Sequence, residues 1–162
     1  MNINYIKSIL NYDPISGIVL YKRDIKRGSK AGTIAGTITK SNHLRIRVQG
    51  ERYLLHRVIW AMQTGKELEI TEQIDHINHD GLDNSWINLR VVSAKENGRN
   101  KSKSKANTSG ATGVCFRNNK WRARIKVDGT YVHLGTFVEF HEAVNARKNA
   151  EVLYGFHENH GN

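Results

Sequence analysis

A polar window in the middle of the sequence concentrates side chains that could do chemistry. It reads QIDHINHDGLDNSWINLRVVSAKENGRN, from Gln73 to Asn100, and holds four carboxylates, two imidazoles and five asparagines. Hydrolysis of a phosphodiester bond needs oxygen ligands for a hard cation, a mostly neutral imidazole as base, and an acceptor that orients this imidazole. The window could supply all three, and a solvated loop between ordinary elements is the plain alternative.

The elements predicted around this window form a β-turn-β-α unit. QIDH ends a short strand, NHDGLDN is rich in turn residues, and NLRVV (Asn88 to Val92) is a second strand. Ser93 and Glu96 have the spacing of a capping box, which indicates that a helix starts there. A unit folded in this way can bring four side chains around one point: Asp75, His76, Asn88 and Asn97.

Other polar residues near the window have competing interpretations. His79 is an alternative base within the turn, whereas Asp80 and Asp83 more simply shape the loop through bonds to its backbone. His56, in LLHR, could contact phosphate or have a structural role. An EF-hand is excluded, because counting from Asp75 puts isoleucine and histidine where oxygen ligands are needed.

The window resembles the signature of HNH endonucleases, in the ββα-metal form found in phage-encoded homing and nicking enzymes. Asn88 follows His76 by twelve residues and Asn97 follows it by twenty-one, and Asp75 and His76 stand as the Asp-His pair. The resemblance implies that His76 is the general base and that Asn88 orients it. It also implies that Asp75 and Asn97 bind one divalent ion, Mg²⁺ by the hardness of the ligands, with Mn²⁺ or another divalent ion as the alternative.

Composition agrees with a polyanionic partner. The formal net charge is +10 and the sequence pI is about 9.9, values typical of nucleic-acid-binding proteins, although a generally soluble basic protein would also have them. The one cysteine, Cys115, excludes an intramolecular disulfide and a four-cysteine zinc site. Without a signal-peptide pattern or a long apolar run, the chain is expected in the cytoplasm and not in a membrane.

The predicted fold class is α+β, in two modules. Residues 1–98 form short antiparallel strands followed by the HNH module, 99–110 form a basic linker, and 111–162 form a second domain. Up to Thr64 the sequence predicts strands and turns, with one helix in RVIWAMQTG that ends at Gly65. The segment RNKSKSKANTSGA contains no large apolar residue, so it is interpreted as a linker.

The last part of the chain is predicted to be three antiparallel strands and one helix. Asn-Asn and Asp-Gly mark two hairpin turns, and Ala143, Ala146, Ala150 and Leu153 recur at helical spacing. In KWRARIK the basic residues alternate with apolar ones, so they share one face of a strand. From Arg99 to Val127 nine residues are basic and none is acidic. Trp121 could belong to the apolar face or turn toward a sugar-phosphate.

This part resembles the AP2 DNA-binding domain over roughly Ser109 to Gly155, in GVCFRNNKWRARIKVDG, YVHLGTF and EAVNARKNAEVLYG. The resemblance implies that the sheet contacts DNA, where arginine can read guanine in the major groove. The implied DNA-binding residues of the sheet are Arg117, Arg122, Arg124, Lys126, Tyr131 and His133. The linker cations expected to lie along phosphates are Arg99, Lys101, Lys103 and Lys105.

The function predicted from these patterns is a metal-dependent endonuclease of the nicking or homing type, acting on double-stranded DNA. A single active site favours nicking by a monomer or a weak dimer. One alternative is a regulator that binds DNA without cutting it. Another is a non-specific toxin-type nuclease, which would not need residues 109–162.

Overall fold

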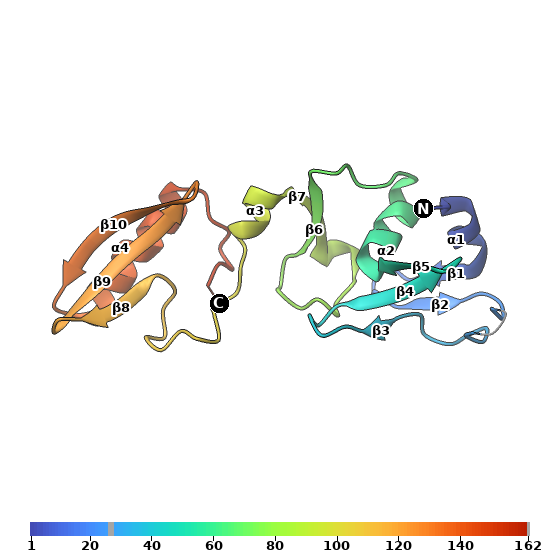
Figure 1. Cartoon of the computed structure of the whole chain (residues 1–162), viewed down its shortest axis with the longest axis horizontal. Helices are drawn as coiled ribbons and strands as arrows, with labels where there is room; N and C mark the ends of the chain where they lie inside the picture. Colours follow the sequence, from blue (N-terminus) through green and yellow to red (C-terminus); the bar gives the residue numbers. More distant parts are fainter. Residues whose placement is uncertain (26–27, 162) are drawn as a thin grey trace. The chain divides into compact units, whose positions relative to one another are not determined.

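The chain is described by a computed structural model that covers residues 1–25 and 28–161. Lys26, Arg27 and Asn162, which fall inside the predicted domains, lie outside the described residues. The chain divides into two compact units, Met1–Ser93 and Ala94–Asn162. The described residues form four α-helices and several small antiparallel sheets, so the predicted α+β class is confirmed (Figure 1). Among them, no helix has the length and apolar character needed to cross a bilayer.

The described residues of the first unit form three small antiparallel sheets and two α-helices. β1 pairs with β2, β4 lies between β3 and β5, and β6 pairs with β7. In chain order the elements are α1 (Ile3–Ile9), β1 (Leu10–Tyr12), β2 (Val19–Tyr21), β3 (Thr37–Ile38), β4 (Leu44–Val48), β5 (Glu51–Leu54), α2 (Leu55–Thr64), β6 (Glu72–His76), the 3-10 turn η1 (Trp86–Asn88) and β7 (Leu89–Ser93).

Helix α1 corrects the prediction of strands and turns alone at the start of the chain. Asn2 caps it, because the Asn2 side chain accepts a hydrogen bond from the backbone nitrogen of Tyr5 at 3.0 Å. Ile6 and Ile9, three residues apart, are both buried. The cap and this spacing were present in the sequence, but the helix has only seven residues and too few apolar positions to show a clear period.

The β4–β5 hairpin and α2 follow the sequence pattern. Ile46 and Val48 of β4 are buried and the arginines between them are exposed, as the alternation predicts. Gln49 and Gly50 form the predicted turn, with φ of 50° and 90°. α2 ends at the predicted glycine, Gly65, whose φ is 73° and whose nitrogen donates to the carbonyl of Ala61 at 3.0 Å.

One hydrophobic core joins the N-terminal elements to the β6–β7 hairpin. Its least exposed large side chains come from α1, β1, β2 and α2, and they include Ile6, Leu10, Val19 and Ile59. Ile74 of β6 and Leu89 of β7 belong to the same cluster. Burial of these two side chains anchors the hairpin that carries Asp75 and His76 to a core built by the first sixty-odd residues.

The second unit has the predicted three-stranded sheet and helix. Asn118 and Asn119, with φ of 53° and 56°, and Asp128 and Gly129, with φ of 49° and 86°, form the two predicted hairpin turns. The strand order is β10-β9-β8. The elements are α3 (Ala94–Gly98), β8 (Val114–Arg117), β9 (Lys120–Val127), β10 (Thr130–Phe137) and α4 (Phe140–Leu153).

Helix α4 packs on the sheet, but its buried stripe differs from the predicted one. Ala143 and Ala150 are buried as predicted, whereas Leu153 is 77% exposed. The stripe instead includes Arg147 and Glu151, which form an ion pair at 3.1 Å and are both almost fully buried. At 100° per residue these two side chains turn the buried side of the helix away from Leu153.

The segment predicted as a linker has no helix or strand, and its first residues pack against the C-terminal residues. The carbonyl of Arg99 accepts from the nitrogen of His157 at 3.1 Å, and that of Lys101 from Gly161 at 2.9 Å. Asn100 between them is 2% exposed. The start of the predicted linker, which has no apolar residues to bury, is thus held by hydrogen bonds to the residues after α4. The limits of the predicted domains stay a prediction.

The turn between β1 and β2 supports the loop that follows β6. The backbone of Trp86 donates to the carbonyl of Pro14 at 2.9 Å, and the Tyr12 hydroxyl donates to the carbonyl of Asn84 at 2.9 Å. Gly17 has a φ of 73°, and a Cβ there would lie 2.5 Å from the Asn84 carbonyl carbon. Only glycine therefore lets the turn approach Asn84 and Ser85 so closely.

We expect Gly17→Ala to destabilise the first unit more than Gly32→Ala does. Both glycines have left-handed φ values, 73° and 76°, so both substitutions carry strain of about 1 kcal/mol. Gly32 has nothing within 4 Å of a new Cβ, whereas at Gly17 the overlap should add about 1–3 kcal/mol. Urea unfolding in a Trp121→Phe background, followed by Trp60 and Trp86 fluorescence, measures the difference. Equal losses of stability would show that the close approach is absent.

Candidate active site

The β6–β7 hairpin places Asp75 and His76 side by side in sequence on opposite faces of one strand. Asp75 is paired across the hairpin with Arg90, and His76 with Leu89. Both Asp75 and His76 are buried, at 7% and 5% exposure. Burial of a carboxylate or an imidazole costs free energy unless the group has a polar partner. We therefore expect a polar partner for each of these two side chains.

Arg90 holds the carboxylate of Asp75. The Nε and Nη2 atoms of Arg90 both donate to Oδ2 of Asp75, at 2.9 and 2.7 Å. The arginine side chain is 30% exposed and the aspartate side chain 8%. This charge-assisted pair fixes the rotamer of Asp75 and offsets the desolvation of its charge. Sequence reasoning did not identify Arg90, although the antiparallel register of the two predicted strands could have placed it opposite Asp75.

Asn84 orients the ring of His76. Nε2 of His76 lies 3.4 Å from Oδ1 of Asn84, and the Asn84 amide nitrogen donates to the carbonyl of Leu82 at 3.2 Å. Because the amide is fixed with its oxygen toward the ring, Nε2 carries the hydrogen and Nδ1 keeps the lone pair. Asn84 is 1% exposed, and sequence reasoning missed it among the asparagines of the loop.

The environment of His76 keeps its imidazole neutral. Burial is the largest cause that lowers the pKa of His76, and the nearby His43 lowers it further. The bond to Asn84 and the charges of Asp75 and Asp80 act in the opposite direction and do not outweigh burial. A neutral imidazole with a defined lone pair can take a proton from water, as a general base must.

Asn88, which the sequence predicted to orient His76, bonds to the loop between the two strands. Its Oδ1 accepts from the backbone nitrogen of Asn78 at 2.9 Å, and its amide nitrogen donates to the carbonyl of Asp83 at 2.7 Å. These bonds hold the loop at Asn78 and at Asp83, the residue before Asn84. Through them Asn88 supports the ring of His76 by way of the loop backbone, and its role in catalysis stays a prediction.

The loop itself is shaped by its carboxylates. Oδ1 of Asp80 accepts from the backbone of Leu82 at 3.0 Å, and Oδ1 of Asp83 accepts from Ser85 at 3.1 Å. Bonds from Ser85, and then from Asn78, lower the pKa of Asp83. His79, the alternative base, lies in the turn with a φ of 65°. The bonds of Asp80 and Asp83 have the loop-shaping role that the sequence analysis expected.

Two further histidines surround His76. Its ring centroid lies 5.1 Å from that of His56 and 5.5 Å from that of His43, both in edge-on contact. His56 is 5% exposed in the first turn of α2, and burial, followed by the influence of the other two rings, lowers its pKa to about 3. His43 precedes β4, and the loop passes so close that a Cβ at Gly81 would lie 3.0 Å from its Nε2. No spacing in the sequence indicated that His43 joins this group.

Asn97, the other predicted ligand, lies in the second unit. It is the fourth residue of α3, which starts directly after β7, and its side chain is half-buried. The chain order β6, β7, α3 is the one that the sequence predicts. Asn97 also has interactions within the molecule, and its part in binding an ion stays a prediction.

Comparison with known proteins finds a family match over the segment that contains the β6–β7 hairpin and α3. Residues 53–99 match the model of the HNH endonuclease family. The match supports an HNH nuclease. The matched HNH segment contains α2, the β6–β7 hairpin and α3, with Asp75, His76, Asn88 and Asn97. HNH nucleases act on nucleic acid and use divalent metal ions. No curated protein and no solved structure matches the chain.

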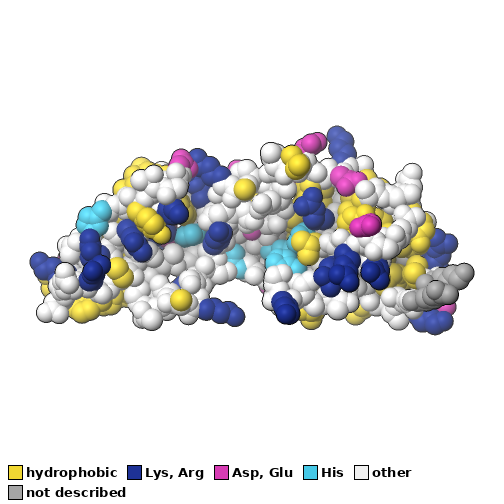
Figure 2. Space-filling view, in the orientation of Figure 1, with side chains coloured by type: hydrophobic (Ala, Val, Ile, Leu, Met, Phe, Trp, Pro, Cys, Tyr) yellow, Lys and Arg dark blue, Asp and Glu magenta, His cyan; other side chains and the backbone are white. Residues whose placement is uncertain are grey.

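Beyond the HNH segment, one face of the second unit's sheet is basic. Arg122, Arg124 and Lys126 of β9 are exposed, while Ala123 and Ile125 between them are buried toward α4. Figure 2 shows that Lys and Arg side chains outnumber acidic ones on the visible surface of the chain. The predicted alternation of basic and apolar residues in β9 is therefore present.

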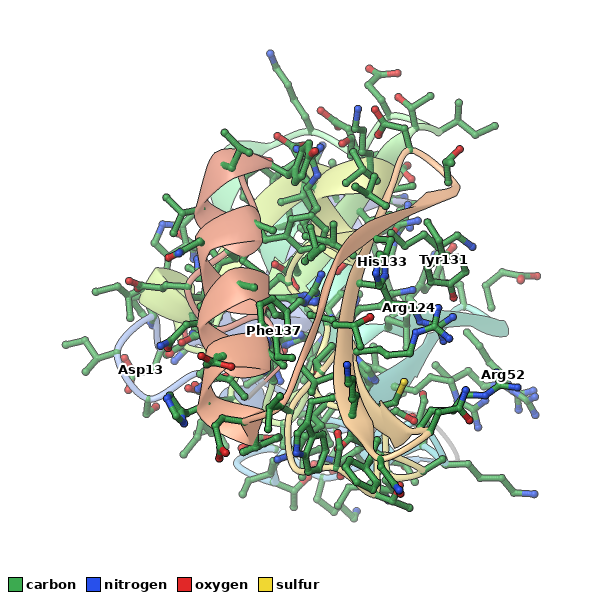
Figure 3. The ribbon with its side chains drawn as sticks, turned by 90° about the vertical axis from the view of Figure 1, so that its left-hand side faces the viewer. Asp13, Arg52, Arg124, Tyr131, His133 and Phe137 are labelled. Carbon is green, nitrogen blue, oxygen red and sulfur yellow. The ribbon has the colours of Figure 1, made fainter. Side chains whose placement is uncertain are left out.

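Tyr131 and His133 lie on this same face. They are the cross-strand partners of Lys126 and Arg124, respectively. The guanidinium of Arg124 lies 4.5 Å from the centre of the Tyr131 ring, and Nζ of Lys126 lies 5.4 Å from it. Figure 3 shows Arg124 and Tyr131 projecting from the side of the sheet opposite α4. These cation–π contacts arrange the two cations around one exposed aromatic ring.

The structure also shows where Trp121 and Arg117 of the second unit lie on the sheet. Trp121 packs against Phe116 and Phe140 in tilted ring contacts, with centroids 4.9 and 4.6 Å from its own, so it belongs to the apolar side of the sheet. Arg117 is exposed at the end of β8, opposite Lys120. The likeness of this unit to AP2 domains stays a prediction.

Of the predicted linker cations, three are exposed and one is partly enclosed. Lys101, Lys103 and Lys105 are exposed, and Nζ of Lys103 donates to the carbonyl of Gly110 at 3.2 Å. The guanidinium of Arg99 lies 5.6 Å from the centre of the Phe156 ring. The three exposed lysines are therefore accessible for the predicted contacts with phosphates, and these contacts stay a prediction.

Proposed function

We propose that this chain is a Mg²⁺-dependent DNA endonuclease of the nicking or homing type, which hydrolyses phosphodiester bonds in double-stranded DNA. One observation carries the proposal. The segment that matches HNH endonucleases ends β6 in a buried Asp75-His76 pair, in which Arg90 holds the carboxylate and Asn84 holds the imidazole. A solvated polar loop would have no reason to bury and orient both groups.

In the proposed reaction His76 acts as the general base. Its lone pair takes a proton from a water molecule, whose oxygen attacks phosphorus in line with the departing 3′ oxygen. The imidazolium formed is favoured by the nearby charges of Asp75 and Asp80, which raise the pKa of His76. The 3′ oxygen leaves with a proton from solvent, so the products carry a 5′-phosphate and a 3′-hydroxyl.

The chemistry of the proposed ligands fits a hard divalent ion. Asp75 offers a carboxylate and Asn97 an amide oxygen, the donors that Mg²⁺ prefers, and Mn²⁺ accepts the same set. Arg90 places both of its bonds on Oδ2 of Asp75, which orients the carboxylate. When bound, the ion would stabilise the charge that develops on the phosphate and on the leaving oxygen.

The basic sheet of the second unit is proposed to bind the DNA. Arg117, Arg122, Arg124 and Lys126 give one face a positive charge, and the net charge of the chain is +10. A strand with arginines at alternate positions can enter the major groove and read base edges, with Tyr131 and His133 beside it. Lys101, Lys103 and Lys105 would add contacts to phosphates, with Arg99 next to them.

We expect the wild-type chain to nick DNA with Mg²⁺ and not with EDTA, and His76→Ala to lower the rate by at least about 100-fold. Asp75→Asn should cause a loss of similar size. The matched control is His79→Asn, which alters the neighbouring histidine and retains activity. Because the target sequence is unknown, the assay maps nicks by run-off sequencing across phage and host DNA.

The same assay separates the competing functions. DNA binding by the wild-type chain without any metal-dependent nick would identify a non-catalytic regulator and contradict the proposal. Nicking that is unchanged after deletion of residues 109–162 would indicate a non-specific nuclease instead. A loss in His79→Asn and not in His76→Ala would move the base to His79.

Arg124→Gln should weaken DNA binding by about tenfold and reduce the slope of log affinity against log salt by about one. The reason is that Arg124 stands at the centre of the basic face, stacked on Tyr131. Lys148→Gln is the matched control, since it removes one charge from α4, away from this face. Fluorescence anisotropy in EDTA over a salt series measures both. Equal effects of the two substitutions would show that net charge alone determines binding.

A further inference from the structure

Three imidazoles from separate parts of the first unit converge on one point. His43 precedes β4, His56 lies in the first turn of α2, and His76 ends β6. One ring nitrogen from each lies within 4.8 Å of the other two. The proposed reaction uses His76 alone and leaves His43 and His56 without a role.

His56 is a buried histidine that lies between two other imidazoles. It is 5% exposed, and its ring makes edge-on contacts with those of His43 and His76. Three ring nitrogens gathered so closely can serve together as ligands of one metal ion. A neutral imidazole ring can donate a lone pair to a metal ion.

His43 is already oriented in the way that metal-binding histidines usually are. Its Nδ1 lies 2.7 Å from the carbonyl oxygen of Ser41, so Nδ1 donates its hydrogen to that oxygen. The lone pair of His43 is therefore on Nε2. Metal ligands commonly donate their other ring hydrogen to a backbone carbonyl in this manner, which fixes the tautomer before an ion arrives.

We propose that His43, His56 and His76 bind a transition-metal ion of the Zn²⁺ class, and that this ion switches off the nuclease. Three neutral imidazoles suit Zn²⁺, Co²⁺ or Ni²⁺ and are poor ligands for Mg²⁺, so the site is separate in chemistry from the oxygen ligands proposed at Asp75. Zinc–nitrogen bonds of about 2.0–2.1 Å require nitrogens roughly 3.3 Å apart. The three ring nitrogens lie within 4.8 Å of one another, so binding an ion requires the rings to move closer together.

Inhibition follows from the single lone pair of a neutral imidazole. If a metal ion occupies the lone pair of His76, the ring cannot take a proton from water. This part of the inference rests on the proposed function, whereas metal binding by the three histidines does not. The competing explanation for the cluster is edge-on packing of three neutral rings without an ion.

Binding is tested on the full chain with Co²⁺ as the probe. We expect one equivalent to give the intense visible absorption of tetrahedral Co²⁺ and Zn²⁺ to displace it. His43→Gln should weaken Co²⁺ affinity at least tenfold, whereas His141→Gln on the exposed face of α4 and Asp75→Asn should not.

In the wild-type chain, Zn²⁺ should shift the imidazole NMR signals of His43, His56 and His76 together and leave His141 unchanged. Binding that is independent of His43, or signals that do not shift, would overturn the site.

Inhibition is tested by nicking in saturating Mg²⁺. One equivalent of Zn²⁺ should lower the wild-type rate at least tenfold, and a zinc chelator with Mg²⁺ retained should restore it. For His43→Gln the ratio of the nicking rates with and without Zn²⁺ should stay close to one, whatever its rate without Zn²⁺. If Zn²⁺ binds through His43 and nicking persists, the switch is wrong and the site stands. If no nicking occurs under any condition, the proposed function and the switch both fail, while the Co²⁺ experiment still decides whether the site exists.

Discussion

The register of the β6–β7 hairpin is the constraint on which the rest of the site depends. Asp75 opposes Arg90 and His76 opposes Leu89. A slip of one residue would turn every side chain of a strand to its other face, so the ion pair would break and Ile74 would leave the core. The paired charges and the buried apolar residues therefore stabilise the same register. The carboxylate and the imidazole are held by strands, whereas the asparagine that orients the ring is held by a loop whose ends are tied down.

The local elements of the site could be predicted from the sequence because each has a local cause. Strand alternation, hairpin turns at Asn-Gly-like positions, and aspartates that bond to the backbone two residues later all act within a few residues. The helix after Ser93 and the face of β9 that carries Arg122 and Arg124 are of this kind.

The contacts that cross long stretches of chain could not be predicted in this way. His43 meets His76 because two loops pack together at Gly81, and Asn84 is placed by Tyr12 and Gly17, far away in sequence. Leu153 is exposed because the buried ion pair of Arg147 and Glu151 turns the buried side of α4 away from it. These contacts depend on how distant parts of the chain pack together, which the spacing of residues does not show. For example, the loop has several asparagines, and only the packing determines that Asn84 contacts His76.

The two proposed sets of ligands differ in the ions that they favour. The oxygen donors proposed for Mg²⁺ are Asp75 and Asn97, and the nitrogen donors proposed for Zn²⁺ are the three histidines. His76 belongs to both groups, since it follows Asp75 directly and contacts His43 and His56. A nuclease built in this way would sense which metal is present through the same ring that performs its chemistry.

Broadening of NMR signals by Mn²⁺, a paramagnetic substitute for Mg²⁺, tests the central claim most directly. The account predicts that small amounts of Mn²⁺ broaden the side-chain signals of Asp75 and Asn97 together, along with the ring of His76, and that Asp75→Asn abolishes the effect at Asn97. Broadening of Asp75 alone, or of exposed carboxylates without preference, would contradict the proposal that one divalent ion joins these residues beside the base.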